Sequence, residues 1–367
     1  MTAMRLHQRI LGPALALLAA TMAWGASAET SSWVSGADPG APIKRGAPGK
    51  APAKLAKPPA SAPASRAVKV LPATGQASTA AKAAPSGEDA AYEAFDQGQY
   101  LTALELATKA AEKRDPQAHT LIGRIHAEGL GVPKNESLAA QWYARAAELG
   151  DPQGMFAVAL ALAEGRGVVQ DRTEAARLFE AAAARRHPLA NYNLSLLFLK
   201  GDGKPENPYR AFQHMTYAAE QGVIAAQYDL GTLYATGTGV DANAFEAAKW
   251  IGKAAAAGHA EAQLDYAVLL FQGRGVAVDQ KKGAKMFRAA AEKGVASAQN
   301  RLARCYANGA GVPKDMVEAA KWTLIAKAGG IEDDALDKLT AKLSRADRAK
   351  AQKEADAWRD KWQIGIE

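Results

Sequence analysis

The sequence predicts an all-α protein, an α/α solenoid in which helical hairpins stack side by side into a superhelix. The first observation is a double-glycine turn, first seen as Gly129-Leu130-Gly131, which occurs six times at a constant spacing of 36 residues. The second is that small and apolar residues precede each turn at helical spacing. The third is that an Asn or Asp follows each first Gly by six residues. Such a period is the signature of hairpins that bury their apolar faces only against their neighbours.

Each double-glycine turn is predicted to join two helices, helix A before it and helix B after it. The residue six positions before the first Gly is small in every copy: Gly123, Ala159, Ser195, Gly231, Ala267 and Ala303. The residues seven and four positions before it are mostly apolar, which places one apolar stripe on helix A. The first Gly suits the left-handed backbone conformation that often ends a helix.

Helix B is predicted to begin at an N-cap, because an Asx side chain accepts hydrogen bonds from the free N–H groups of a starting helix. The six N-cap residues are Asn135, Asp171, Asn207, Asn243, Asp279 and Asp315. In three copies a Glu follows the cap by three residues, at Glu174, Glu246 and Glu318, and predicts the reciprocal bond of a capping box. Helix B then carries Trp142, Leu178, His214, Trp250, Met286 and Trp322 in register.

The chain before the repeats divides into three parts. Residues 1–28 have the features of a signal peptide: Arg5 and Arg9, an apolar run, and small residues that predict cleavage after Ala28. The protein would therefore be periplasmic or secreted, with no stable membrane insertion after the signal peptide is cleaved. Residues 29–87, rich in Ala, Pro and Lys, are expected to be a disordered linker. Residues 88–114 predict a first hairpin with a shorter turn.

The repeats occupy residues 115–330, and residues 331–367 predict capping helices. Ser344 with Asp347 predicts an N-cap there, and Trp358 and Trp362, four residues apart, share one face of the last helix. We expect these two tryptophans to cover the open end of the last hairpin.

The charge follows this division and argues against nucleic acid as a partner. The formal net charge is +7, and Lys and Arg outnumber Asp and Glu by 8 to 2 in residues 29–87 alone. The part from Glu88 onward is therefore nearly neutral, whereas a nucleic-acid footprint lies on one face of a folded domain. A solvated spacer is the favoured interpretation of the basic linker, and contact with anionic envelope polymers or lipid is the alternative.

No residue pattern assembles a catalytic, cofactor or metal site. The glycine turns lack the third Gly of a dinucleotide-binding motif, and neither Ser-x-x-Lys nor Gly-x-Ser-x-Gly occurs. His187 and His259 share a position that other copies fill with Asp151 or Val223, so a ligand role is not favoured. Cys305, the single cysteine, falls at an apolar helix A position and is expected to be a buried thiol.

A surface is the remaining candidate site. The positions eight, five and one before the turn Gly form a stripe on helix A whose chemistry changes between copies, and helices A usually line the concave side of such arrays. The predicted protein-binding residues are Leu160, Asn193, Leu196, Asp229, Thr232, Asp265, Val268, Arg301 and Arg304. Leu160, Leu196 and Val268 are apolar, and two interpretations stay open for them: an apolar docking strip in the groove, or part of the core.

The residues of one copy resemble a known family. The segment from Ala226 to Val240, AQYDLGTLYATGTGV, followed by Ala247-Ala248-Lys249-Trp250 and Ala254–Gly258, closely resembles the Sel1-like repeat, and six copies cover about 216 of the 367 residues. The resemblance implies an α/α solenoid related to tetratricopeptide repeats, with the first hairpin in the tetratricopeptide manner. It also implies an adaptor that gathers other proteins. Exported bacterial members of the family include regulators of sensor kinases and of envelope assembly.

The sequence thus predicts a non-enzymatic protein-binding scaffold or regulator of the bacterial cell envelope, without cofactor and with a protein partner whose identity is open. The alternative is a cell-wall module that binds or hydrolyses peptidoglycan or a β-lactam, an activity linked to a cysteine-rich branch of the family. With Cys305 alone, this chain lacks the disulfides of that branch.

Overall fold

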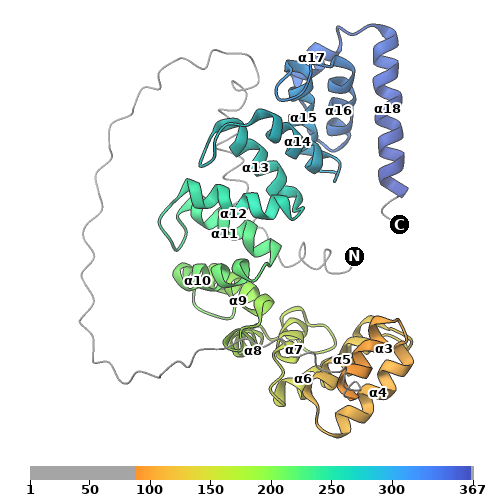
Figure 1. Cartoon of the computed structure of the whole chain (residues 1–367), viewed down its shortest axis with the longest axis vertical. Helices are drawn as coiled ribbons and strands as arrows, with labels where there is room; N and C mark the ends of the chain where they lie inside the picture. The colour runs from red at the N-terminus through yellow and green to blue at the C-terminus, as the bar shows by residue number, and fades with distance from the viewer. Residues whose placement is uncertain (1–86, 365–367) are drawn as a thin grey trace, which may run out of the picture.

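A computed structural model describes residues 87–364, and this part of the chain is all helical, without strands. Its sixteen helices form seven hairpins followed by two further helices (Figure 1). Their bounds are α3 Gly87–Asp96, α4 Tyr100–Glu112, α5 Pro116–Glu128, α6 Glu136–Glu148, α7 Pro152–Glu164, α8 Arg172–Ala184, α9 Pro188–Lys200, α10 Pro208–Glu220, α11 Ile224–Thr236, α12 Ala244–Ala256, α13 Ala260–Gln272, α14 Gln280–Ala291, α15 Ala296–Asn308, α16 Met316–Ala328, α17 Asp334–Thr340 and α18 Arg345–Ile364. The signal peptide and the linker predicted within residues 1–86 lie outside the described residues.

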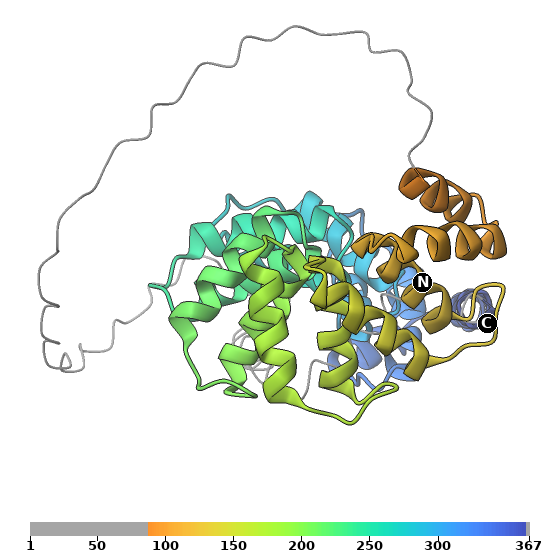
Figure 2. The same ribbon diagram turned by 90° about the horizontal axis from the view of Figure 1, so that it is seen from below.

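The hairpins stack in chain order into an array that curves along its length (Figure 1). Seen along the long axis, the array bends round so that the first hairpin and α18 lie on the same side of that axis (Figure 2). Odd-numbered helices α5 to α15 are the helices A of the six repeats, and even-numbered helices α6 to α16 are the helices B.

Helix B begins as its sequence predicts. The side chain of each Asx cap accepts a backbone N–H, as in the 2.9 Å bond from Leu138 N–H to Asn135 Oδ1. The predicted reciprocal bond of the capping box, from the cap N–H to the Glu side chain, is wrong. The N–H of Asn243 instead donates to the carbonyl oxygen of Tyr234 on helix A, and Glu246 accepts the indole N–H of Trp250 at 3.2 Å. Glu318 does the same for Trp322 at 3.0 Å, and Glu174 bonds Arg177. The turn therefore satisfies the donor that the Glu was expected to satisfy.

The two glycines of each turn serve different purposes. The first ends helix A in the left-handed region, at a φ of 76° for Gly237, and a Cβ there would meet only its own turn, at 3.4 Å or more. The second, Gly239, has a φ of 73°, and its Cβ would overlap the main-chain carbonyl of Pro208 in the preceding hairpin. The second Gly thus permits close backbone contact with the preceding hairpin in five of the six turns, the exception being Gly131, which faces side-chain atoms of Tyr100 and Leu101.

Small residues on helix A set the distance between the two helices of a hairpin. All six predicted positions are buried. A Cβ on Gly231 would lie 2.5 Å from a side-chain carbon of Ile251, and one on Gly123 would lie 2.6 Å from the ring of Tyr143. Neither site has room for a larger residue, since protein interiors are close-packed.

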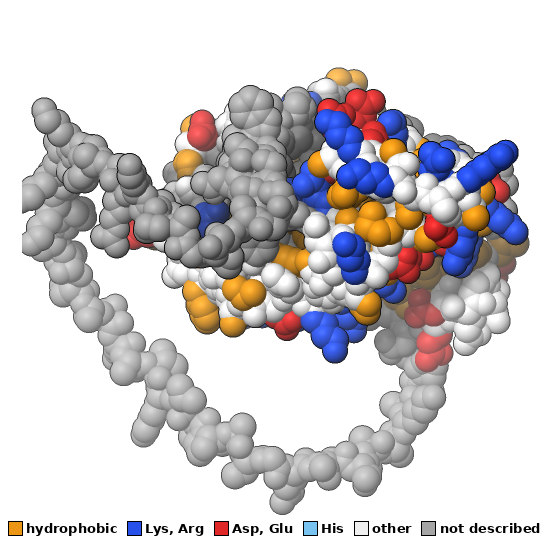
Figure 3. Space-filling model, turned by 90° about the horizontal axis from the view of Figure 1, so that it is seen from above, with side chains coloured by type: hydrophobic (Ala, Val, Ile, Leu, Met, Phe, Trp, Pro, Cys, Tyr) orange, Lys and Arg blue, Asp and Glu red, His pale blue; other side chains and the backbone are white. Residues whose placement is uncertain are grey.

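The last helices close the array as a cap. Ser344 accepts the N–H of Asp347 at 3.1 Å, which confirms the predicted N-cap, and Ala351 and Ala355 of α18 are buried. The ring of Trp358 stands edge-on to Trp322 with centroids 5.9 Å apart, so Trp358 covers the last repeat as predicted. The side chain of Trp362 lies outside the described residues. From above, this end displays basic and acidic side chains side by side (Figure 3).

Candidate protein-binding surface

Contacts between neighbouring hairpins identify the inner layer of the curved array. Helices A of successive repeats contact one another directly, as α5 does α7, and two side-chain hydrogen bonds join α9 to α11 and α11 to α13. The described helices B of successive repeats do not make such extensive contact with one another. On their side of the array, the extensive contact is between α16 and the capping helix α18. Because the more closely spaced layer of a curved stack lies inside, helices A line the concave side.

Two of the predicted stripe residues are carboxyls that tie helices A together. Tyr192 on α9 donates its O–H to Asp229 on α11 at 3.0 Å, and Tyr228 on α11 donates to Asp265 on α13 at 2.8 Å. Burial raises the pKa of Asp229 to about 7 and that of Asp265 to about 6, although each tyrosine hydrogen bond acts in the opposite direction. Burial also raises the pKa values of Tyr192 and Tyr228 well above the usual range. These pairs form a structural ladder between repeats.

The three apolar stripe residues divide between core and surface. Leu196 is 3% exposed and belongs to the core cluster of α9 to α12, so the core interpretation applies to it. Leu160 and Val268 are only partly buried, each at the margin of a core cluster. The apolar strip is thus interrupted at its centre.

Two further residues also depart from the predicted surface, because Asp229 and Thr232 are 7% and 5% exposed. The hydroxyl of Thr232 donates a hydrogen bond to the carbonyl oxygen of Tyr228, one helical turn earlier, at 3.3 Å. Asp229 is buried against Tyr192 of the neighbouring helix A, and Thr232 is buried beside its own helix. Leu196, Asp229 and Thr232 are therefore removed from the candidate surface.

The polar remainder of the stripe is partly accessible. Asn193 donates to the carbonyl oxygen of Leu189 at 2.8 Å, and burial lowers the pKa of Arg301. Arg304 forms an ion pair with Asp333, the N-cap of α17, at 2.6 Å. The accessible residues, called the concave stripe below, are Leu160, Asn193, Asp265, Val268, Arg301 and Arg304. They run from apolar at α7 to basic at α15.

The sequence carried one signal for the ladder that its interpretation missed. Tyr192 and Tyr228 stand one 36-residue period apart, as do Asp229 and Asp265. The two hydrogen-bonded pairs, Tyr192 with Asp229 and Tyr228 with Asp265, therefore have the same separation of 37 residues. A Tyr and an Asp that recur together at a separation of one period plus one residue indicate contact between successive repeats. This signal is visible only when neighbouring copies are compared.

The histidines that share a repeat position are helix N-caps. Nδ1 of His187 accepts the N–H of Ala190 at 3.1 Å, and Nδ1 of His259 accepts that of Ala262 at 3.3 Å. The same position holds Asp115 and Asp151, whose carboxylates cap α5 and α7. Burial lowers the pKa of His187, which favours the neutral ring that an acceptor needs.

The chemistry of the remaining reactive groups is structural within the described residues. Cys305 is a buried free thiol, and burial raises its pKa to about 12. No group of three or more His, Cys, Asp or Glu in residues 87–364 is placed to hold a metal ion. Over the same residues, no helix combines the length and apolar character that a membrane crossing requires.

Comparison with known proteins agrees with this geometry. The model of the Sel1 repeat matches residues 116–151, 152–187, 188–223, 224–259, 260–295 and 296–330. No curated protein matches the chain.

Two solved structures share the fold at moderate identity. A Sel1 repeat protein from Oxalobacter formigenes is 27% identical, with a TM-score of 0.58 over 68% of this chain and 99% of that one. The protein c5321, described as a protective antigen of uropathogenic Escherichia coli with an SLR fold, is also 27% identical. Its TM-score is 0.51 over 75% of this chain and 68% of that one. With six matched repeats over more than half of its length, the chain belongs to the Sel1 repeat family.

Proposed function

We propose that this protein is a non-enzymatic scaffold or regulator of the bacterial cell envelope that binds a protein partner on the concave side of its solenoid. Sel1 repeat proteins are in general scaffolds for protein interaction. The observation that carries the proposal for this chain is the concave stripe, which stays partly accessible although the layer around it is tightly packed.

The chemistry of the stripe suits a folded or helical protein surface. Leu160 and Val268 offer apolar contacts that are separated by three repeats, and Arg301 adds positive charge at the C-terminal end, where Arg304 is paired with Asp333. A few buried anchors usually carry most of the affinity of an interface, and the surrounding polar residues supply complementarity. The length of the array separates these anchors, so it favours a partner that is long enough to contact several repeats.

Residues 1–28 support the placement in the envelope. Two arginines, an apolar run and Ala26-Ser27-Ala28 together form the pattern of an export signal. N-terminal sequencing of the protein recovered from the periplasm or the medium tests this part, and we expect a chain that begins at Glu29. Recovery of the uncleaved chain in the cytoplasm would contradict the envelope role and leave the binding surface untouched.

The binding surface is tested by capture from an envelope fraction with the full chain as bait. We expect a partner that wild type retains and that Leu160→Glu and Val268→Glu lose, while their melting temperatures stay within a few degrees of wild type. Leu101→Glu is the matched control, because Leu101 is 59% exposed on α4, outside the concave stripe.

Equal retention by all four proteins would refute the concave stripe as the binding surface. If either Glu variant fails to fold, Leu160→Gln and Val268→Gln replace them with smaller perturbations. Arg301→Gln then provides a third position, at the basic end of the stripe.

A further inference from the structure

A second surface lies at the edge formed by the double-glycine turns. The second residue of helix B occupies one register position in seven hairpins: Leu101, Ser137, Thr173, Tyr209, Phe245, Lys281 and Val317. Three of these are exposed large hydrophobic residues, at 59% for Leu101, 62% for Tyr209 and 65% for Phe245. Ser137 and Thr173 are exposed in the same position, so the fold does not require an apolar residue there.

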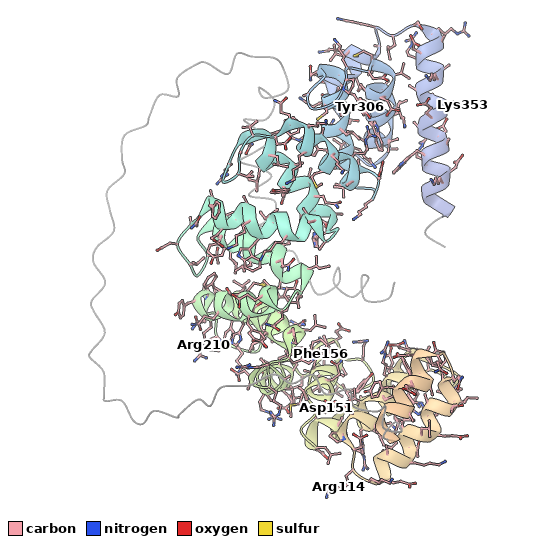
Figure 4. The ribbon with its side chains drawn as sticks, viewed as in Figure 1. Arg114, Asp151, Phe156, Arg210, Tyr306 and Lys353 are labelled. Atoms are coloured by element: carbon pink, nitrogen blue, oxygen red, sulfur yellow. The ribbon has the colours of Figure 1, made fainter. Side chains whose placement is uncertain are left out.

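The exposed residues in the middle of the array form one continuous edge. Gly239 packs on the backbone of Pro208 and Tyr209, and a Cβ on Gly275 would lie 3.0 Å from the Phe245 nitrogen. Turns and aromatic residues therefore alternate along the array. Val169 and Val278, 88% and 61% exposed, lie in turns of the same kind at either end. We call Val169, Tyr209, Phe245 and Val278 the turn edge; Arg210, next to Tyr209, marks its place at the outer side of α10 (Figure 4).

Two exposed acidic residues lie beside the aromatic residues. Glu206 and Asp241 are in the turns that precede Tyr209 and Phe245, and no ion pair joins either to another described residue. Of the basic residues nearby, Lys204 pairs with Glu180, Arg172 pairs with Asp202, and Arg210 has its guanidinium 5.7 Å from the centroid of the Phe198 ring, whereas Arg274 is exposed in the turn after Phe245. The edge therefore offers apolar contacts with two carboxylates that a basic occupant could pair.

Residues 29–87 of the same chain have that composition. They contain nine prolines, and eight Lys or Arg against two acidic residues. Within them Pro39, Pro42, Arg45 and Pro48 stand three residues or a multiple of three apart. A polyproline II helix has three residues per turn and rises about 9 Å per turn, so these four residues would share one face.

The backbone connects the two aromatic positions along the edge. Gly239, in the turn that leads into α12, packs on the backbone of Pro208 and Tyr209 at the start of α10. Proline-rich segments in this conformation dock on aromatic surfaces because their backbone is already ordered. We propose that the turn edge binds residues 39–48 of its own chain, with prolines against Tyr209 and Phe245 and with Lys44 and Arg45 towards Glu206 and Asp241.

The covalent connection permits this contact. About 39 residues separate Pro48 from α3, and an extended chain spans about 3.1 Å per residue, or about 120 Å. Tyr209 and Phe245 lie in the third and fourth repeats, a few tens of Å along the array at about 10 Å per packed helix. A tethered ligand gains from an effective concentration that is about a millimolar for short flexible linkers and lower for longer ones, so modest contacts can hold it.

The test places a photo-crosslinker on the edge of the full chain. Phe245 is replaced by p-benzoylphenylalanine, and the matched control carries the same group at Ser137, which is exposed in the same register but has no aromatic residue in either neighbouring copy. After irradiation and digestion, mass spectrometry identifies the cross-linked peptide. We expect residues 39–48 in a monomeric product, with a yield at least fivefold above that at position 137.

Two changes of condition sharpen the result. Lys44→Glu with Arg45→Glu should lower the yield severalfold, as should raising the ionic strength from 0.05 to 0.5 M, because charges at a surface are screened. Cross-links that appear only in a dimer and increase with protein concentration would overturn the proposal in favour of a second copy. Equal yields at positions 245 and 137 would overturn it outright. Capture of a partner on the concave stripe is measured separately, so the two proposals fail independently.

Discussion

Replacing Gly239 by alanine tests the reason for the double glycine. At the first glycine of the turn, Gly237, an added Cβ meets only ordinary contacts at 3.4 Å or more, so backbone strain at a φ of 76° is the sole penalty. That strain costs about 1 kcal/mol. At Gly239 the φ of 73° carries the same strain, and the Cβ would also lie 2.5 Å from the carbonyl carbon of Pro208. The two hairpins must then separate.

The two contributions give the expected magnitude. Overpacking against an immobile backbone costs about 1–3 kcal/mol, so we expect Gly239→Ala to lower the free energy of unfolding by about 2–4 kcal/mol. Gly222→Ala is the control for strain alone, because Gly222 has a φ of 85° and no atom lies within 4 Å of its Cβ position. It should resemble Gly237→Ala.

Urea denaturation followed by circular dichroism gives the three stabilities. In a repeat array the loss is concentrated at the damaged interface, since each repeat contacts only its neighbours. Amide hydrogen exchange should therefore accelerate most in α10 to α12. Equal destabilisation by Gly239→Ala and Gly237→Ala would refute the close approach of the repeats at this glycine.

Four further predictions test the packing and the ladder. Trp250→Ala should cost about 3–5 kcal/mol in urea denaturation, because the ring is 7% exposed, and an unshifted midpoint would place it at the surface. Because the folded pKa of Asp229 is raised to about 7, the folded state binds more protons than the unfolded state between about pH 4 and 7, so stability falls as the pH rises through this range. Asp229→Asn should remove up to about 4 kcal/mol of that loss, and identical pH profiles for variant and wild type would contradict the raised pKa. Leu196→Glu should unfold the middle of the array, which circular dichroism would detect, whereas a folded variant would return this residue to the groove. Cys305 should react with a thiol reagent only after denaturant is added, because its thiol is buried with a pKa raised to about 12; rapid labelling of the native protein would disprove this.

The sequence alone predicted the fold because its signals are local. Helix starts follow from caps such as Asn135, whose side chain bonds its own helix, and helix ends follow from glycines with positive φ such as Gly129. The period itself identified the stacking, since equal copies occupy equal positions in an array. Leu194, Leu230 and Leu302 are fully buried, as the helical spacing predicts.

The candidate site was predicted only in part because neighbouring copies decide exposure. Position 196 is apolar and buried, whereas its equivalent Val268 is partly accessible, and nothing in the spacing separates the two. Glu246 was assigned to a capping box from its distance to Asn243, but the N–H of Asn243 donates to the carbonyl oxygen of Tyr234 on the preceding helix, and Glu246 accepts the indole N–H of Trp250 instead. Local rules rank partners within one helix and cannot include those that another helix supplies.

The sequence by itself therefore determined the period, the helices, the glycine turns and the membership of a repeat family. Only the tertiary structure decided that the second glycine in five of the six turns allows contact between repeats, that Asp229 and Asp265 bond tyrosines of the preceding repeat, and that Tyr209 and Phe245 stand exposed on one edge. The physical reason is the range of the interactions. Backbone conformation and capping depend on residues within one helical turn, whereas burial and hydrogen bonding depend on atoms that folding brings together from a full repeat away.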